Sequence, residues 1–428
     1  MKSKNCLVIF NNSWGEVDFI LPILKFLYEQ KFNVYTSFRS IQMLNKKKNY
    51  QDLYYILNQI SKVIKPKRDK QKINFFKILL SYITRPKFIF IKLKSFRFSK
   101  IKSHIKNIKN NNTNENINFL KKKKIKIDTI LCADFDSDYY DWITEYPDAK
   151  FILFPHAITL RGSYLNKFRN VTKKVYEESF YNRKYQLSKF PENTILFSGD
   201  KDELNYFKEF TPQNIVLKIL GFPRLTNNWI KYLHFKIGSK FNKKISKKNL
   251  LLIIGKIDYL GINEIENKIK STIKIAEDFG YNLIIKNHPR NQFNLKKYLN
   301  FSKKIKITES NLSISGTLKF CEIVILTSKS GVSLECAFQK KIVVEYYKYG
   351  GEIKKNKVYE YKINNQLQSI YKHLDLIYSC NSHSDLSNFF YKITTNKKFN
   401  IKILKKQNKT IMSKIYKSND IKSILNYV

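Results

Sequence analysis

Features typical of membrane-spanning, secreted and zinc-binding proteins are missing from this chain of 428 residues. No stretch reaches the roughly 18 consecutive apolar residues that a membrane span needs. The five cysteines are scattered, odd in number and without CxxC spacing, which favours reduced structural thiols over a disulfide framework or a zinc site. The first apolar run, at residues 6–10, is too short for the core of a signal peptide. We therefore expect a protein that stays in the cytoplasm.

Acidic residues are scarce, at 34 against 80 Lys and Arg, which gives a formal net charge of +46. Part of this excess reflects a composition crowded with Lys, Asn and Ile. The basic residues nevertheless concentrate between residues 62 and 126, where they alternate with Phe and Ile. This alternation of basic and apolar residues is typical of a helix lying on anionic lipid, and equally of an amphipathic helix packed on its own domain. Nucleic acid is the other anionic partner that such a charge allows.

A glycine-rich P-loop is also missing, but short apolar runs repeatedly end in small or polar residues. This pattern is typical of parallel α/β sheets, whose ligands bind at the carboxyl ends of the strands. Strands are predicted at residues 6–10, 32–36, 129–133, 150–154, 194–197, 215–220, 250–254, 282–286, 305–307, 322–326 and 342–345. Helical spacing is found at residues 17–30, 263–279, 332–338 and 386–428.

The spacing of these elements predicts two Rossmann-like α/β domains. The first covers residues 1–228 and contains a basic helical insertion at about 41–127. A weakly patterned linker at 229–249 leads to the second domain at 250–395. Residues 396–428 form a C-terminal helical segment.

One predicted strand end carries three basic residues. Lys286, His288 and Arg290 follow one another at every second residue, and Pro289 is expected to end the strand because proline fixes φ. Past the strand end, the three basic groups can spread around a phosphate. A histidine with an ordinary role in a loop is the alternative for His288.

A second strand end leads through a Ser/Gly turn into a helix. Ser328 and Ser330 offer hydroxyls there, and the N–H groups after Gly331 form a natural anion site. A plain N-cap serine would give the same pattern. Gly255, after the first strand of this domain, would let a loop approach the donor closely, or would simply form a turn. Together these motifs predict a nucleotide-phosphate site.

From residue 250 to residue 345 the chain resembles the C-terminal domain of GT-B glycosyltransferases. It is most similar to bacterial enzymes of capsule, teichoic acid and lipopolysaccharide synthesis that use cytidine-activated donors. The CDP-glycerol glycerophosphotransferases and several Kdo and sialic acid transferases share a His-Pro pair, here His288-Pro289, and a downstream Ser-rich turn. At the front, Gly15-Glu16 before a helix containing Pro22 resembles the Gly-Glu loop of the Kdo transferases. Residues 41–127 match nothing that we can place.

The resemblance implies a GT-B fold, with two Rossmann-like domains facing an interdomain cleft, the second of which binds the donor. It implies a metal-independent transferase without a cofactor, whose co-substrate is a nucleotide-activated sugar or polyol phosphate, CMP- or CDP-linked. The acceptor would be a cell-surface polysaccharide or a lipid-linked molecule, reached from the inner face of the cytoplasmic membrane. His288 would contact the nucleotide phosphate. Glu335 would hold the ribose, although a glutamate in a first helical turn is also favourable with the helix dipole.

The base that activates the acceptor is open among three candidates in the first domain. Glu16 is the first, by resemblance to the Kdo transferases. His156 follows another strand end and resembles the His-Gly position of the glycerophosphotransferases, but Ala157 replaces the glycine. Imidazole is well tuned for such work near neutrality. The third candidate is the group of carboxylates at Asp134, Asp136 and Asp138. Its spacing does not match a calcium loop.

Two rival functions remain open. A UDP-N-acetylglucosamine 2-epimerase shares the fold, but its expected Gly-x-Arg-Pro-Glu loop is replaced here by residues 11–16. A nucleic-acid-binding protein fits the charge, yet no recognised nucleic-acid-binding module is present, so we expect no specific nucleic-acid partner. Arg224, which follows the last strand before the linker, would either line the interdomain cleft or lie exposed in a turn.

Overall fold

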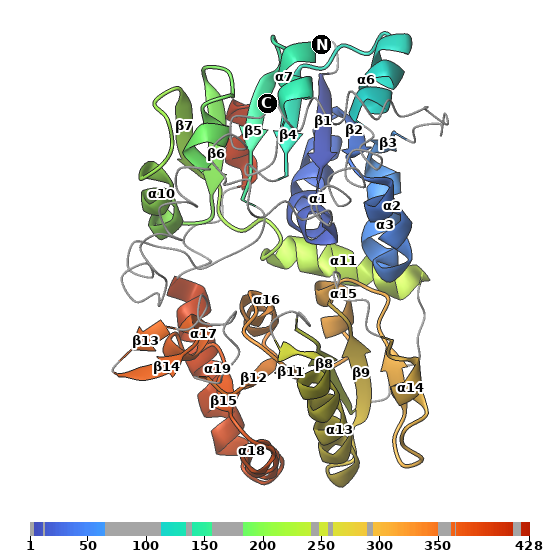
Figure 1. Ribbon diagram of the computed structural model, residues 1–428, viewed down its shortest axis with the longest axis vertical. Coiled ribbons are helices and arrows are strands. Elements are labelled where there is room, and N and C mark those ends of the chain that lie inside the picture. Colours follow the sequence, from blue (N-terminus) through green and yellow to red (C-terminus); the bar gives the residue numbers. More distant parts are fainter. Residues whose placement is uncertain are drawn as a thin grey trace, which may run out of the picture.

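The protein folds into two α/β domains that lie one above the other (Figure 1). The computed structural model describes residues 4–11, 13–64, 113–133, 139–155, 183–240, 248–255, 260–288, 294–349, 361–363, 365–413 and 421–428. Each domain is built on a parallel sheet flanked by helices, which confirms the predicted fold class. Most of the basic stretch predicted to meet lipid, at residues 65–112, lies outside the described residues.

The N-terminal sheet is parallel throughout and has the strand order β3-β2-β1-β4-β5-β6-β7. Its central strands are buried along nearly their whole length, which is why they read as continuous apolar runs rather than as alternating patterns. The strands are β1 (Asn5–Phe10), β2 (Asn33–Phe38), β3 (Lys62–Val63), β4 (Thr129–Cys132), β5 (Lys150–Leu153), β6 (Thr194–Ser198) and β7 (Ile215–Ile219).

Helices cover this sheet, and α1 follows the predicted order of strand, loop and helix. Its N-terminus is held by a capping box between Ser13 and Glu16, and it continues through Pro22. The described helical elements of the domain are α1 (Trp14–Glu29), α2 (Ile41–Asn45), η1 (Lys46–Asn49), α3 (Gln51–Ile60), α6 (Thr113–Lys122), α7 (Tyr140–Glu145) and α10 (Lys201–Lys208).

The C-terminal sheet is also parallel, in the order β10-β9-β8-β11-β12-β15, and a small antiparallel pair lies beside it. The strand predicted at 305–307 starts later than expected, because the Lys306 N–H donates to the Asn282 side chain and pairing begins at Ile307. The strands are β8 (Asn249–Ile253), β9 (Asn282–Lys286), β10 (Ile307–Glu309), β11 (Ile323–Leu326), β12 (Ile342–Tyr346), β13 (Tyr361–Ile363), β14 (Gln366–Gln368) and β15 (Tyr378–Cys380).

The helices of the second domain include the predicted long helix, α13, with a hydrophobic stripe at Ile265, Ile269, Ile273 and Ala276 against the sheet. The described helical elements here are α13 (Ile262–Asp278), α14 (Lys296–Leu299), α15 (Ile314–Leu318), α16 (Val332–Phe338), α17 (Ile370–His373), α18 (His383–Thr395) and α19 (Lys397–Ile411). The last described helical element, η6 (Ile421–Asn426), lies on the first domain (Figure 1). No helix among the described residues is long and apolar enough to span a bilayer.

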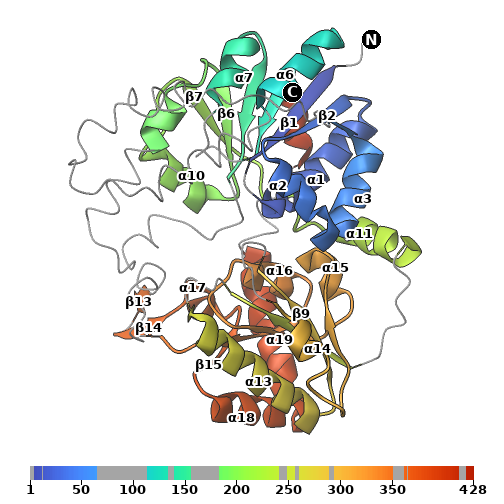
Figure 2. The same cartoon turned by 45° about the vertical axis from the view of Figure 1, so that its right-hand side comes forward.

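The stretch expected to be a linker contains a helix, α11 (Asn227–Lys240), which lies between the domains (Figure 2). Trp229, Leu233 and Ile237 repeat every four residues and are buried, while α3 and α15 contact the helix from either domain. Lysines and asparagines between these positions dilute the apolar pattern in the sequence. The described first part of the predicted linker is therefore a helix at the domain interface.

The last described segment returns to the N-terminal domain. Tyr427 makes an edge contact with Phe197, with ring centroids 5.6 Å apart, and the Lys4 ammonium donates to the Val428 carbonyl over 2.9 Å. One hydrophobic cluster also includes residues of both domains, such as Trp14 of the first and Leu334 of the second. The two domains thus share a continuous core at their interface.

Candidate nucleotide-binding and interdomain site

Four strand ends of the C-terminal sheet lie in one row. Lys286 of β9 pairs with Ile253 of β8, Ile253 with Leu326 of β11, and Leu326 with Glu345 of β12. The chain segments that follow these strands therefore leave the same edge of the sheet. The structure in this way brings the two predicted phosphate motifs and the predicted close-approach glycine together at the carboxyl edge, where open α/β sheets bind ligands.

Gly255 lies against the Ser/Gly turn. Its N–H donates to the Thr327 hydroxyl over 2.8 Å. A Cβ atom at residue 255 would come within 2.1 Å of Ser328 Oγ and 2.9 Å of Ser328 Cβ. The glycine is thus required for the close approach of the two loops, and this contact fixes the position of the turn.

The Ser/Gly turn caps α16. Ser330 Oγ accepts the Val332 N–H over 3.3 Å, and the Ser330 carbonyl accepts both the N–H and the hydroxyl of Ser333. Gly331 has a φ of −60°, so its backbone conformation does not itself require glycine. Ser328, Ser330 and Gly331 are half-buried. Gly331 is the N-cap residue, and Ser330 just before it accepts an N–H of the first helical residue; a phosphate contact stays a prediction.

Lys286 is buried, with 4% of its surface exposed, and points toward the domain interface. Its ammonium donates to the Leu312 carbonyl and lies 5.0 Å from the centre of the Tyr50 ring in the other domain. To reach a nucleotide it would have to leave both contacts. His288 is half-buried at the end of the described stretch, whereas Arg290 lies outside it.

Glu16 has a structural role in the first domain. Its side chain is fully buried, and its two carboxylate oxygens accept the N–H groups of Asn11, over 2.8 Å, and Ser13, over 3.0 Å. The carboxylate thereby holds the loop between β1 and α1. A role as catalytic base stays a prediction, and would require one of these hydrogen bonds to be exchanged for an acceptor hydroxyl.

The other base candidates, His156 and the carboxylates of residues 134–138, lie outside the described residues. The strands that precede these two segments are described. The chain enters these two segments from β5 and β4, and β4 lies between β1 and β5 in the sheet. The three candidate segments thus follow neighbouring strands of one parallel sheet.

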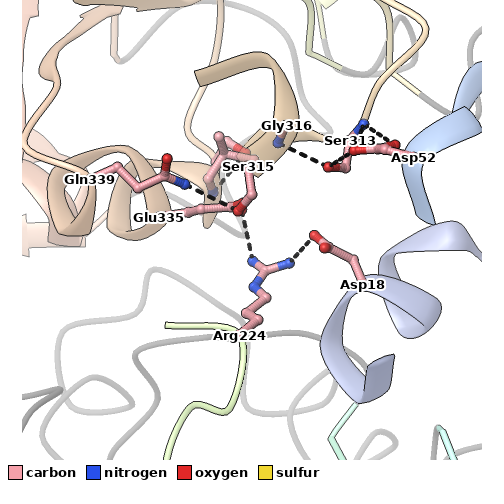
Figure 3. Close-up of polar contacts among 10 residues, drawn as sticks. Asp18, Asp52, Arg224, Ser313, Ser315, Gly316, Glu335 and Gln339 are labelled. Carbon is pink, nitrogen blue, oxygen red and sulfur yellow. Dashed lines mark hydrogen bonds and ion pairs between the residues drawn. The ribbon is translucent and has the colours of Figure 1, made fainter. Parts of the chain in front are cut away.

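An ion cluster joins the two domains (Figure 3). Arg224, after β7, places Nη1 3.1 Å from Asp18 Oδ2 on α1 and Nη2 3.4 Å from Glu335 Oε2 on α16. All three residues are at most 8% exposed. The Ser315 hydroxyl donates to the second Glu335 oxygen, and Gln339 donates to Ser315 over 3.1 Å. Of the two positions considered for Arg224, the structure shows the interdomain one.

Glu335 is consequently held inside the protein. Both of its oxygens face partners, Arg224 and Ser315, so binding of a ribose would need one of these to be displaced. The predicted contact with ribose therefore stays a prediction.

A second junction connects α3 with α15 (Figure 3). The Asp52 carboxylate accepts the Ser313 N–H over 2.9 Å and the Ser313 hydroxyl over 2.5 Å, and Ser313 Oγ in turn accepts the Gly316 N–H over 3.0 Å. A Cβ atom at residue 316 would lie 2.4 Å from Asp52 Oδ2. A carboxylate of the first domain thus completes the helix cap of the second.

Burial shifts the ionisation of this interface. Desolvation, with Glu335 nearby, raises the pKa of Asp18 to about 7, although Arg224 acts in the opposite direction. Desolvation lowers the pKa of Lys286 to about 8 against the attraction of Asp52 and Asp18. Desolvation also raises the pKa of Glu345, at the end of β12, to about 7, while the Tyr349 hydroxyl bonded to it lowers the pKa.

The acidic residues Asp18, Asp52 and Glu345 and the hydroxyl of Thr327 are among the polar groups that were not found from the sequence. Asp18 gave a usable signal, since a carboxylate between Val17 and Phe19 in an apolar helix needs a buried partner. Asp52 reads as an ordinary acidic residue of a first helical turn. No described group of His, Cys, Asp and Glu side chains is arranged to hold a metal ion.

Gly255→Ala should destabilise the folded protein by about 1–3 kcal/mol, because the new methyl group overlaps Ser328. Introduced into a Ser328→Gly background, the same change should cost less than about 0.5 kcal/mol, since the overlapping atoms are gone. Chemical denaturation of the four proteins measures both costs. Equal costs in the two backgrounds would contradict the proposed contact.

The pKa of Asp18 is raised in the folded protein, whereas an aspartate in the unfolded chain has a pKa of about 4. The folded state therefore binds the proton of the Asp18 carboxyl group more tightly than the unfolded state does. The resulting stability is present at low pH and is lost as pH rises through about 7. The Asn side chain of Asp18→Asn cannot ionise, so this variant lacks the loss of stability that wild type shows as pH rises. The free energy of unfolding of the variant minus that of wild type should therefore be about 1–3 kcal/mol larger at pH 8 than at pH 5. Urea unfolding measures the difference. Asp148→Asn, an exposed change in the turn before β5, should stay within about 0.5 kcal/mol at both pH values. A pH-independent difference for Asp18→Asn would refute the shift.

No protein-family model and no curated protein match this chain. Solved structures do match it. The wall teichoic acid polymerase TagF is 11% identical, with a TM-score of 0.57 over 98% of this chain and 86% of TagF. The UDP-GlcNAc 2-epimerase of Methanocaldococcus jannaschii, in complex with UDP-GlcNAc and UDP, is 15% identical, with a TM-score of 0.51 over 92% and 93%. A putative UDP-N-acetylglucosamine 2-epimerase from Listeria monocytogenes is 12% identical, with a TM-score of 0.51 over 94% and 91%. The chain therefore has the GT-B fold that these enzymes share.

Proposed function

We propose that this protein is a glycosyltransferase that moves a sugar or polyol phosphate from a nucleotide-activated donor to a cell-surface polysaccharide or lipid-linked acceptor. One observation carries the proposal: within a GT-B fold, Gly255, His288 and the Ser/Gly turn follow strands that end in one row. The resemblance of the His-Pro pair and the Ser-rich turn to cytidine-dependent enzymes favours a CMP- or CDP-linked donor. The same resemblance favours capsule or lipopolysaccharide synthesis.

The leaving nucleotide phosphate would be bound at this edge. Transfer requires donors aimed at the charge that develops on the phosphate as the bond to the sugar breaks. His288, the hydroxyls of Ser328 and Ser330, and the N–H groups after Gly331 are the proposed donors. Arg290, outside the described residues, is a further proposed donor. The close contact at Gly255 holds the turn in place before the ligand arrives, which reduces the ordering that binding requires.

Glu335 and Lys286 are assigned a less direct part in the proposed reaction. Each already contacts the opposite domain, through Arg224 and Tyr50 respectively. A nucleotide that drew either group toward itself would therefore also alter the domain interface.

For the acceptor base we favour His156 over Glu16. Glu16 is fully buried and accepts two backbone N–H groups, so its removal should disturb the loop after β1 whatever its chemistry. His156 follows β5, two strands away from β1 in the same sheet. Neutral imidazole can take a proton from a hydroxyl near neutral pH. Asp134, Asp136 and Asp138 remain the third proposal. We expect no bound metal to be required.

The protein is further proposed to work at the inner face of the cytoplasmic membrane as a peripheral protein. Support comes from the net charge of +46, which attracts an anionic surface, and from the lipid-linked acceptor that the resemblance implies.

Nucleotide binding tests the function directly. Thermal unfolding of wild type and His288→Ala should be followed with CMP, CDP, UDP, GDP and ADP. A ligand present at about 100 times its dissociation constant stabilises the folded state by about 2.7 kcal/mol. We expect CMP or CDP to raise the melting temperature of the wild type and to raise that of His288→Ala much less. No shift with any nucleotide would sink the transferase proposal.

The rival functions give different results in the same series. UDP alone raising the melting temperature, with conversion of UDP-N-acetylglucosamine in the absence of any acceptor, would identify an epimerase instead. Binding to random-sequence DNA that stays tight as salt rises would point to a nucleic-acid-binding protein, because attraction driven only by counterion release weakens steeply with salt.

Turnover of Glu16→Gln and His156→Ala distinguishes the base candidates. If His156 is the base, His156→Ala should lose about 100-fold or more in kcat, while Glu16→Gln should lose stability and keep a larger share of its activity. Full turnover by both variants would exclude both residues and leave the carboxylates at 134–138.

A further inference from the structure

One helix of the C-terminal domain, α19, has an unusually basic exposed face. It contains six lysines and no acidic residue in its 15 residues. Its opposite face is anchored: the Phe399 ring contacts Tyr378 and Phe389, Gln407 donates to the Leu376 carbonyl over 2.9 Å, and Ile411 is buried. The helix is therefore fixed on the domain beside α18, and its outer face has a defined direction (Figure 1).

The outward residues recur at intervals of three and four, which places them on one face of the helix. We name them the α19 stripe: Lys398, Ile401, Lys402, Lys405, Lys409 and Met412. Two of them are apolar and open to solvent, Ile401 at 52% and Met412 at 50% exposure. The stripe thus combines four positive charges with two uncovered apolar side chains.

Lysine-rich composition does not by itself produce such a stripe. Helix α13 also has exposed lysines, at Lys270 and Lys274. The same helix carries acidic residues, however, and two of these form pairs: Glu264 with Lys268 at 3.3 Å and Glu266 with Lys297 at 2.5 Å. Near α19 the described pair is Lys406 with Asp375 at 2.9 Å, and Lys406 is not part of the stripe. Of these two helices, α19 is thus the one whose positive charge is not balanced along its own length.

We propose that the α19 stripe docks the C-terminal domain on an anionic phospholipid bilayer. Lysines near such a surface strengthen partitioning by about fivefold each. An amphipathic helix in the plane of the interface can place its apolar side chains at the boundary between headgroups and acyl chains. Ile401 and Met412 favour this partner over nucleic acid, which offers phosphates to the lysines and little apolar surface to these two side chains. The lysines on either side would reach the headgroups.

Flotation with lipid vesicles tests the proposal on the whole protein, without nucleotide or acceptor. Wild type should bind vesicles of phosphatidylcholine with about 30% phosphatidylglycerol and not vesicles of phosphatidylcholine alone. Lys405→Gln/Lys409→Gln should weaken the partition coefficient by roughly 25-fold, at about fivefold per lysine. Ile401→Asn should weaken it by about tenfold through the loss of apolar burial. All three positions are exposed, so these variants should fold.

The matched control is Lys270→Gln/Lys274→Gln, which removes the same charge from α13 at the same spacing of four residues. It should weaken binding by less than about threefold, because screening confines the attraction to charges close to the surface. An equal loss in the two double variants would make the attraction a property of net charge and overturn the proposal. Loss in neither would also overturn it. So would tight binding to duplex DNA that depends on the α19 lysines and not on Ile401. The transferase proposal stands or falls separately, since no donor is present in this experiment.

Discussion

The arrangement of the two domains depends on one buried guanidinium. Arg224 lies between Asp18 of the first domain and Glu335 of the second, away from water. Removing Glu335 would leave the Arg224 guanidinium without its full compensation in a low-dielectric interface, which costs far more than the loss of a surface ion pair. The helices that carry these carboxylates, α1 and α16, each begin just past a strand end. The guanidinium therefore joins two helices that follow strand ends in different domains.

Two other contacts also join the domains. Asp52 reaches across to cap α15, and Lys286 reaches back over Tyr50. Two of the groups predicted to bind the nucleotide, Lys286 and Glu335, are thus occupied with the opposite domain. If a nucleotide contacts Lys286 or Glu335 as proposed, its binding would also change the contacts between the domains. A change of charge at Lys286 or Glu335 would alter contacts with residues of both domains.

The sequence predicted the sheets well because parallel buried strands are continuous apolar runs, and their ends are marked by residues such as Gly255 and His288. It could not predict which side chains at those ends face a ligand and which face the other domain. Lys286 lies two residues before His288, and its ammonium contacts the Leu312 carbonyl and the Tyr50 ring at the domain interface. Glu16 is predicted to be a base from its loop, and the structure shows in addition that its carboxylate accepts two backbone N–H groups of that loop. Such choices depend on contacts between distant parts of the chain, which local pattern does not contain.

The return of the last segment to the first domain has a mechanical consequence. The polypeptide passes between the domains twice, once through α11 and once after α19 (Figure 1). Two covalent connections at separate points oppose twisting of one domain against the other more strongly than a single tether would. The second domain is also formed from the middle of the polypeptide, like an insertion, while both ends of the described chain belong to the first.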